Sequence, residues 1–115
     1  MKYDNYLLPA NDLAKGREFY EGTLGLPVKF DFSARGFLAF SVGDAEPAII
    51  LRNQPGSKPA IWFEVDDVKT AYEQLKDKGV AFLSEPFPIP TGLAVEFDDP
   101  FGNRLGITDY STRPR

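Results

Sequence analysis

The fold is decided by residues 60–68, which read AIWFEVDDV. The first six positions are rich in β-branched and aromatic residues, which favour a strand. Asp66 or Asp67 can then cap a helix over residues 67–78, and Gly79 can end it. The apolar residues of that helix follow the i, i+3, i+4, i+7 spacing of one buried face: Val68, Ala71, Tyr72 and Leu75. This stretch therefore predicts a strand followed directly by an amphipathic helix.

The same order of elements occurs earlier in the chain. A strand over residues 3–9 leads to a helix over residues 12–23, with Asn11 or Asp12 as its cap and Gly25 as its stop. Three strands are expected after it, at residues 27–33, 36–42 and 47–52. The first half of the chain is therefore predicted to have the order βαβββ.

The second half repeats this order, with corresponding features about 55 residues apart. Its three later strands are expected near residues 80–84, 92–98 and 104–110, and the segment 85–91, EPFPIPT, is too rich in proline for a strand. We expect one module at residues 1–53, a linker at 54–59, a second module at 60–110 and a loose tail at 111–115. Each module is too small to bury its sheet alone, so two must pack, within one chain or between two chains.

Composition excludes several classes of function. The 115 residues contain no Cys and no His, which removes disulfides, thiolate nucleophiles and histidine-based catalytic triads. A metal site could use only oxygen ligands. The net charge of −4 and the absence of a basic run argue against a nucleic-acid partner. No apolar run approaches the ~18 residues of a membrane span, and the N-terminus lacks the apolar core of a signal peptide, so we expect a cytoplasmic protein.

Three motifs resemble those of one superfamily. The first is Asn11-Asp12-Leu13 with Phe19-Tyr20 and Leu24-Gly25-Leu26, the second is residues 63–68, FEVDDV, and the third is residues 99–103, DPFGN. Together they resemble the vicinal oxygen chelate superfamily of glyoxalase I, extradiol dioxygenases, fosfomycin-resistance enzymes and bleomycin-resistance proteins. The resemblance implies an α+β fold in which two βαβββ modules form a U-shaped, partly open β-barrel, usually in a homodimer. From the residues alone, the paired acids Asp66-Asp67 and Asp98-Asp99 are explained by helix capping and turn formation.

The resemblance also locates the metal ligands of the superfamily's enzymes, which are His and Glu side chains. The four corresponding positions here are Asn5, Ile50, Ala60 and Gly106. Only Asn5 has a side-chain donor atom, and one amide does not hold a divalent ion against water. We therefore predict that the chain has neither the superfamily metal nor another cofactor, and that the metal-dependent activities are absent with it.

If those four positions mark a cavity, strand alternation adds their neighbours on the same face. The neighbours are Leu7, Ala48, Arg52, Trp62, Glu64, Arg104 and Thr108. The candidate ligand-binding set drawn from them, with one aromatic residue of the proline-rich loop, is Trp62, Glu64, Arg52, Arg104, Asn5 and Phe87.

Each of these side chains has a structural alternative. Trp62 either stacks on a planar ligand or packs between the sheets. Glu64 can pair with a ligand cation, with Arg52 or with Arg104. Phe87 lies in a loop that is either a lid or a simple connection.

Three functional hypotheses follow. The first is a metal-independent small-molecule-binding protein of the glyoxalase/bleomycin-resistance type, which sequesters an aromatic or cationic drug. The second is an atypical enzyme of the superfamily (a lyase, isomerase or dioxygenase-like enzyme) that uses a carboxylate such as Glu64 or Glu96, or a non-standard metal site. The third is a structural or regulatory domain that acts through its dimer surface.

Overall fold

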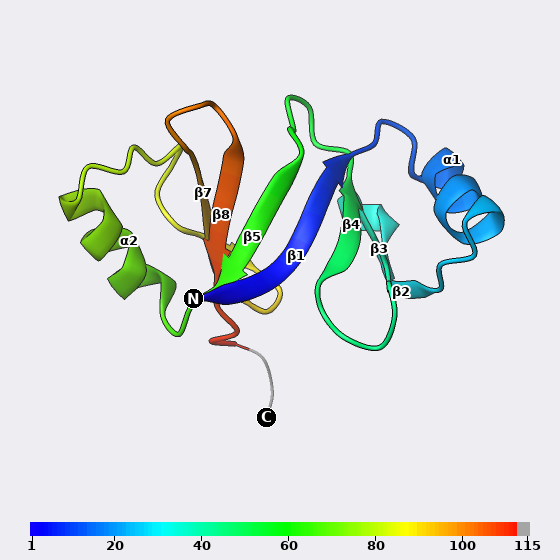
Figure 1. Ribbon diagram of the computed structural model, residues 1–115, viewed down its shortest axis with the longest axis horizontal. Helices are drawn as coiled ribbons and strands as arrows, with labels where there is room; N and C mark the ends of the chain where they lie inside the picture. The colour runs from blue at the N-terminus through cyan, green and yellow to red at the C-terminus, as the bar shows by residue number, and fades with distance from the viewer. Residues whose placement is uncertain (113–115) are drawn as a thin grey trace. The chain divides into compact units, whose positions relative to one another are not determined.

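The structure is a computed structural model in which residues 1–112 are described (Figure 1). The chain divides into two compact units. We call residues Asn5–Ala60 the N-terminal unit, and Met1–Asp4 with the described residues from Ile61 onward the C-terminal unit. Residues 113–115 of the predicted tail lie outside the described part.

The N-terminal unit has the predicted order βαβββ. Its elements are β1 (Lys2–Pro9, which begins in the other unit), α1 (Leu13–Arg17) with a π-helical turn at Glu18–Thr23, β2 (Val28–Phe32), β3 (Phe37–Phe40) and β4 (Ala48–Arg52). The strands are ordered β2-β3-β4-β1, with β1 and β4 parallel and the other pairs antiparallel. Asp12 caps α1 as predicted, because its side chain accepts the Lys15 N–H at 3.1 Å.

One face of this sheet packs against α1. Leu13 of the helix joins Leu38, Phe40 and Leu51 of the strands in a buried cluster. Tyr20, from the π-helical turn, stacks on Phe40 with 5.2 Å between ring centroids. Because side chains alternate along a strand, Asn5 and Arg52 lie on the opposite face of this unit.

The C-terminal unit repeats the order. Its elements are β5 (Ala60–Glu64, whose first residue belongs to the N-terminal unit), α2 (Val68–Asp77), β6 (Phe87–Ile89), β7 (Gly92–Asp98) and β8 (Arg104–Thr108). The strands are ordered β5-β8-β7-β6. Asp67 caps α2, because its carboxylate accepts the Lys69 N–H at 3.1 Å and the Thr70 hydroxyl at 2.9 Å. Val68 of α2 packs with Val95 and Ile107 of the sheet, so the helix covers the face of this sheet that carries those residues.

The prediction of a strand near residues 80–84 was wrong, and so was the assignment of residues 85–91 to a loop. Phe82 makes only a single bridge, to Phe97, whereas Phe87–Ile89 forms β6 inside the proline-rich segment. β6 is the last strand of the sheet, and an edge strand accommodates Pro88 because one side of it needs no N–H donor. The Phe82 ring instead packs against Tyr72, with centroids 4.6 Å apart, and so belongs to the core.

The motif at residues 99–103 is a turn, as predicted. Asp99 Oδ1 accepts the N–H groups of Phe101 at 2.8 Å and Asn103 at 2.9 Å, and Oδ2 accepts the Asn103 amide at 2.8 Å. These hydrogen bonds, led by the Asn103 side chain, lower the pKa of Asp99. The residues of this motif therefore hold the β7–β8 connection in shape.

Within residues 1–112, neither α1 nor α2 has the length and hydrophobicity of a membrane-spanning helix.

Candidate functional site

Four of the six predicted site residues lie on one face of the C-terminal sheet. The register places Glu96 opposite Gly106, Asp98 opposite Arg104, and both Phe87 and Thr108 opposite Ala94. Directly opposed residues share a face, and this face is the one that does not pack against α2. We call it the helix-free face; it carries Trp62, Glu64, Phe87 and Arg104.

At the centre of the helix-free face, the Trp62 indole lies over Gly106. A Cβ atom on Gly106 would stand 2.5 Å from the indole Nε1 and 2.6 Å from Cδ1, closer than real Cβ contacts. Nε1 donates a hydrogen bond of 3.0 Å to Glu96 Oε2 on β7. Trp62 is 8% exposed, so most of its surface is used in packing. The glycine is therefore required by the tryptophan, and the tryptophan holds Glu96 in position.

The charged residues of the helix-free face are paired. Glu64 lies 3.8 Å from Lys2, with 32% of the Glu64 side chain exposed. Arg104 Nε lies 2.6 Å from Asp98 Oδ1, and this hydrogen bond raises the pKa of Arg104. Within residues 1–112 Glu64 does not pair with Arg104, which was one of the alternatives that the sequence left open. The shorter and less exposed ion pair is Arg104–Asp98, and the longer and more exposed one is Glu64–Lys2.

Phe87 lies at the outer edge of the helix-free face. It is 36% exposed and stands on β6, which pairs only three residues with β7. The lid that the sequence allowed for is thus replaced by a short strand, but the aromatic ring remains accessible.

The other two predicted residues lie in the N-terminal unit and have structural contacts there. Asn5 is 8% exposed, and its Oδ1 accepts the Ala48 N–H at 2.9 Å, which ties β1 to β4. Arg52 is 6% exposed, and its Nη2 donates to the Lys58 carbonyl at 3.4 Å. The Asn5 contact supports the pairing of β1 with β4, and the Arg52 contact reaches the segment that follows β4.

The residues at the four superfamily ligand positions do not fit a divalent metal. Ile50 and Ala60 have no donor atom, and the Asn5 oxygen accepts a backbone N–H. At position 106 the Trp62 indole fills the space into which a ligand side chain would extend. In the described part of the chain no three Asp, Glu, His or Cys side chains are close enough together to hold a metal ion.

Sequence reasoning did not predict the contacts of two acidic residues of this unit. Glu96 was named as a candidate base, but its bond to Trp62 crosses β8 and depends on a register that periodicity does not give. Asp109 is buried, and it accepts the N–H groups of Val68 at 2.9 Å and Leu93 at 3.0 Å and the Ser111 hydroxyl at 2.7 Å. Burial raises the pKa of Asp109, but the hydrogen bonds from Leu93, Val68 and Ser111 together lower it below its usual value.

Comparison with known proteins agrees with this fold. The chain belongs to the Glyoxalase/Bleomycin resistance protein/Dioxygenase superfamily, whose family model matches residues 2–107. An uncharacterised protein of Bacillus subtilis (strain 168), YraH, is 30% identical in an alignment that covers 93% of this chain and 97% of YraH.

Two solved structures show the same fold. One is the hypothetical protein BH1468 from Bacillus halodurans C-125, with a TM-score of 0.77, 16% identity, and coverage of 99% of this chain and 97% of that one. The other is Streptomyces coelicolor methylmalonyl-CoA epimerase in complex with 2-nitronate-propionyl-CoA, with a TM-score of 0.77, 19% identity, and coverage of 97% and 99%. The predicted glyoxalase-type α+β fold is thereby confirmed.

Proposed function

We propose that this protein binds a small molecule with an aromatic or cationic group on the helix-free face, without a metal at the superfamily's ligand positions. The observation that carries the proposal is the packing of Trp62 over Gly106, with its indole bonded to Glu96. This packing fills a metal-ligand position with an aromatic side chain. It also leaves accessible apolar and acidic groups on the same face, at Phe87 and Glu64.

The two accessible groups suit a ligand of that chemistry. Glu64 is held only by an exposed ion pair, and such pairs contribute about 0–1 kcal/mol, so a ligand cation can replace Lys2 at little cost. Phe87 offers a partly exposed ring for apolar or cation–π contact. Further along the same face, the Trp62–Glu96 hydrogen bond and the Arg104–Asp98 ion pair hold their side chains in place, and fewer side chains then need to be ordered when a ligand binds.

The test uses chelator-treated protein and the fluorescence of Trp62, the only tryptophan. A panel of planar cationic drugs, bleomycin-type glycopeptides, thiol conjugates and divalent metals is screened by thermal shift. A ligand at ~100 times its Kd adds ~2.7 kcal/mol to stability, a shift of several degrees. We expect a shift with an aromatic or cationic compound and none with a metal alone.

The matched variants are Glu64→Gln and, on α2 of the same unit, Glu73→Gln. Both remove one negative charge, from the partly exposed Glu64 and the exposed Glu73, but only Glu64 lies on the helix-free face. Loss of affinity in Glu64→Gln alone supports the proposal. Equal affinity in both variants, or stabilisation by a divalent metal without any other ligand, contradicts it.

A second candidate is proton transfer by Glu96. Epimerases are among the proteins of similar fold, and the Trp62 indole orients the partly buried Glu96 carboxylate on the helix-free face. A general base must be held within reach of the proton that it removes. This hypothesis predicts that the protein exchanges an acidic C–H of an acyl thioester with deuterium from D2O. Glu96→Gln should abolish the exchange while binding persists. If no thioester in a tested panel exchanges its C–H with deuterium, the hypothesis is wrong.

A further inference from the structure

Three residues of the helix-free face form a row across the C-terminal sheet. Phe87 of β6 is directly opposed to Ala94 of β7, and Ala94 is directly opposed to Thr108 of β8. Directly opposed residues point to the same side of a sheet, so the three side chains follow one another across three strands.

Glu64 of β5 is the fourth member of this row. The N–H of Val65, which follows β5, donates to the Thr108 carbonyl at 2.9 Å, so Glu64 lies beside Thr108. Two residues earlier on each strand, Trp62 packs over Gly106, which agrees with this alignment. The row therefore begins at the Glu64 carboxylate and ends at the aromatic ring on β6.

Only the two ends of the row are accessible. The Glu64 side chain is 32% exposed and Phe87 is 36% exposed, whereas Ala94 is 0% and Thr108 1% exposed. A ligand that lies along the row therefore meets an acidic group at one end and an apolar ring at the other. The residues between them offer it no surface of their own.

The distance between the two ends sets the length of a ligand that uses both. Adjacent strands lie about 4.8 Å apart, so three strand intervals put the Cα atoms of Glu64 and Phe87 about 14 Å apart. Side chains that lean towards each other shorten the distance between the carboxylate and the ring to roughly 10 Å. A single ring with a short aminoalkyl chain therefore reaches one end of the row but not the other.

We propose that the ligand of the helix-free face is an elongated organic cation, with an ammonium group at one end and an aromatic ring at the other, roughly 10–14 Å apart. The inference rests on the function proposed above, because it takes the helix-free face as the binding site. The ammonium group replaces Lys2 beside Glu64, and the ring packs against Phe87. Each contact alone is weak, but a spacer of the right length makes the second contact intramolecular and so raises the affinity.

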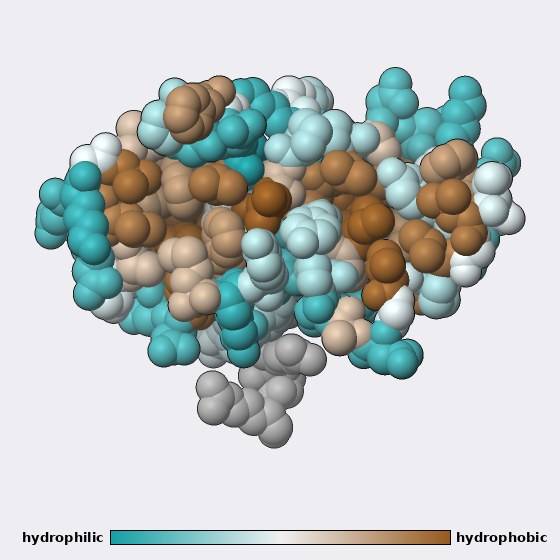
Figure 2. Space-filling view, viewed as in Figure 1, coloured by the Kyte–Doolittle hydropathy of each residue, from teal (hydrophilic) through white to brown (hydrophobic). Residues whose placement is uncertain are grey.

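The experiment uses benzyl ethers that carry a terminal ammonium group and differ in the number of ethylene glycol units between the two ends, from none to four. Each unit adds three single bonds of about 1.5 Å, or roughly 3.7 Å when extended. The spacer must be polar because Figure 2 shows apolar surface in several places, to which a longer alkyl chain would bind unselectively.

Binding to the 15N-labelled full chain is followed by NMR through the amide signals of Glu64 and Phe87. The affinity should be highest with one or two units, about two- to ten-fold above that of the probe without a unit, and should fall again with four. With the best probe, both signals should follow a single Kd, because one molecule contacts both ends of the row.

Two variants each remove one end of the row, Glu64→Gln and Phe87→Ala. In each of them the affinity should no longer depend on spacer length, because only one contact remains, and the best probe should bind about two- to ten-fold more weakly. Their matched controls are Glu73→Gln on α2 and Phe101→Ala in the β7–β8 turn, which remove an exposed charge and an exposed ring outside the row. Both controls should bind the probes as the wild type does.

Lys2→Gln should change the affinity in the opposite direction. The Lys2 side chain is 74% exposed and lies 3.8 Å from Glu64, so its removal takes away a competitor of the ammonium group. The ammonium probes should bind about two- to five-fold more tightly, and alcohols of the same length should bind as before. Lys69→Gln, which removes an exposed lysine of α2, is the control.

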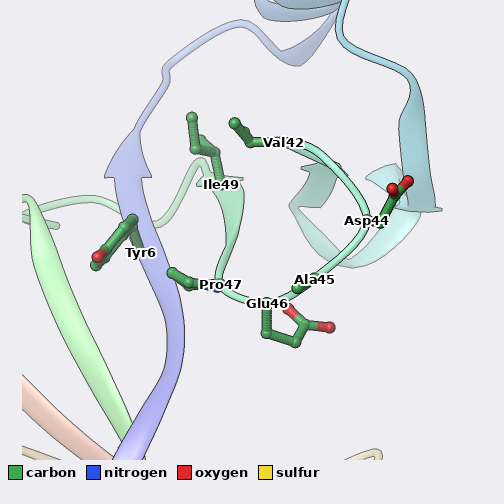
Figure 3. Close-up of a pocket in the computed structure, with 7 residues that line it drawn as sticks. All are labelled: Tyr6, Val42, Asp44, Ala45, Glu46, Pro47 and Ile49. Atoms are coloured by element: carbon green, nitrogen blue, oxygen red, sulfur yellow. The ribbon is translucent and has the colours of Figure 1, made fainter.

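A hollow in the N-terminal unit is the alternative site for the benzyl group. It has a volume of about 440 Å³ and lies between Tyr6 of β1, Ile49 of β4 and the loop that joins β3 to β4 (Figure 3). The Asp44 and Glu46 carboxylates of that loop point away from the hollow, so binding there does not select for a cation. The amide signals of Tyr6 and Ile49 therefore report unselective binding.

The outcomes separate the elongated ligand from the function proposed above. Equal affinity at all spacer lengths, with shifts at Glu64 or Phe87, leaves the helix-free face as a binding site but overturns the elongated ligand. Shifts confined to Tyr6 and Ile49, or no shift with any probe, overturn both. An affinity maximum at one or two units that is lost in Glu64→Gln and in Phe87→Ala supports both.

Discussion

Replacement of Gly106 by alanine tests the arrangement at the centre of the helix-free face. The new Cβ atom would stand 2.5 Å from Trp62 Nε1, whereas ordinary contacts begin at 3.4 Å. The indole must therefore move by about 1 Å, or β5 and β8 must separate. A displacement of that size also breaks the 3.0 Å hydrogen bond from Nε1 to Glu96.

The expected cost has two parts. Overpacking of a well-packed position costs about 1–3 kcal/mol. Loss of a hydrogen bond to a charged group costs about 1.5–3 kcal/mol, part of which solvent recovers at the half-buried Glu96. We expect Gly106→Ala to destabilise the protein by about 2–4 kcal/mol, which lowers Tm by roughly 10 °C.

The assay is urea denaturation followed by Trp62 fluorescence and, independently, by circular dichroism. Gly22→Ala is the control, because a Cβ there meets nothing within 4 Å and the backbone needs no positive φ. It should be neutral or slightly stabilising. Trp62→Phe should relieve part of the cost of Gly106→Ala, because the smaller ring leaves room for the methyl group. If Gly106→Ala matches the wild type in stability and in emission maximum, the packing of Trp62 over Gly106 is wrong.

Three further predictions concern acidic residues with structural contacts. Asp109→Asn should cost about 2–3 kcal/mol, because an amide presents a donor to N–H groups that need an acceptor. The pKa of Asp109 is lowered in the folded state, so its contribution is complete above the unfolded pKa of about 3.9 and is lost as the pH falls through the folded value. Acid titration of stability should therefore be shallower in the variant; an unchanged slope would assign the effect elsewhere. Asp67→Ala should cost about 1 kcal/mol in thermal unfolding through loss of the α2 cap, and no change would mean that another group caps the helix. Asp99→Ala should speed amide exchange at Phe101 and Asn103 while exchange at Val95 stays slow, and equal protection in both proteins would contradict its role in the turn.

The local features of the fold could be predicted from the sequence because each depends on a few neighbouring residues. Asp12 and Asp67 cap their helices within three residues, and Gly25 and Gly79 end the helical segments with positive φ values of 75° and 96°. The repeated βαβββ order follows from these signals. Strand β6 could not be predicted in the same way, because its pairing is decided by β7 and by its place at the sheet edge, not by its own composition.

The sequence could predict which of the candidate residues on β5 and β8 share a face of the sheet, but not which side chains pair with one another. Alternation placed Trp62, Glu64 and Arg104 on one face, and the structure has them there. Which of them pair depends on the register of β7 against β8, which sets Asp98 beside Arg104, and on Lys2, which belongs to the C-terminal unit. A one-residue change in register would reverse the face of every side chain, so no sequence argument could have supplied these pairs.

Gly106 and Trp62 have to be considered together, and this bears on why position 106 does not fit a metal ligand. Without the glycine, the indole has no room above β8; without the indole, Glu96 loses the hydrogen bond from Trp62 Nε1. A carboxylate introduced at position 106 alone would therefore meet the indole and compete with Glu96 for it, and it would gain no second ligand from Ile50 or Ala60. The absence of donor atoms at positions 50 and 60 and the packing of Trp62 at position 106 both disfavour metal binding at the superfamily's ligand positions. The helix-free face is built to hold its own aromatic and acidic side chains in contact, and any ligand must be recognised by the groups that remain exposed beside them.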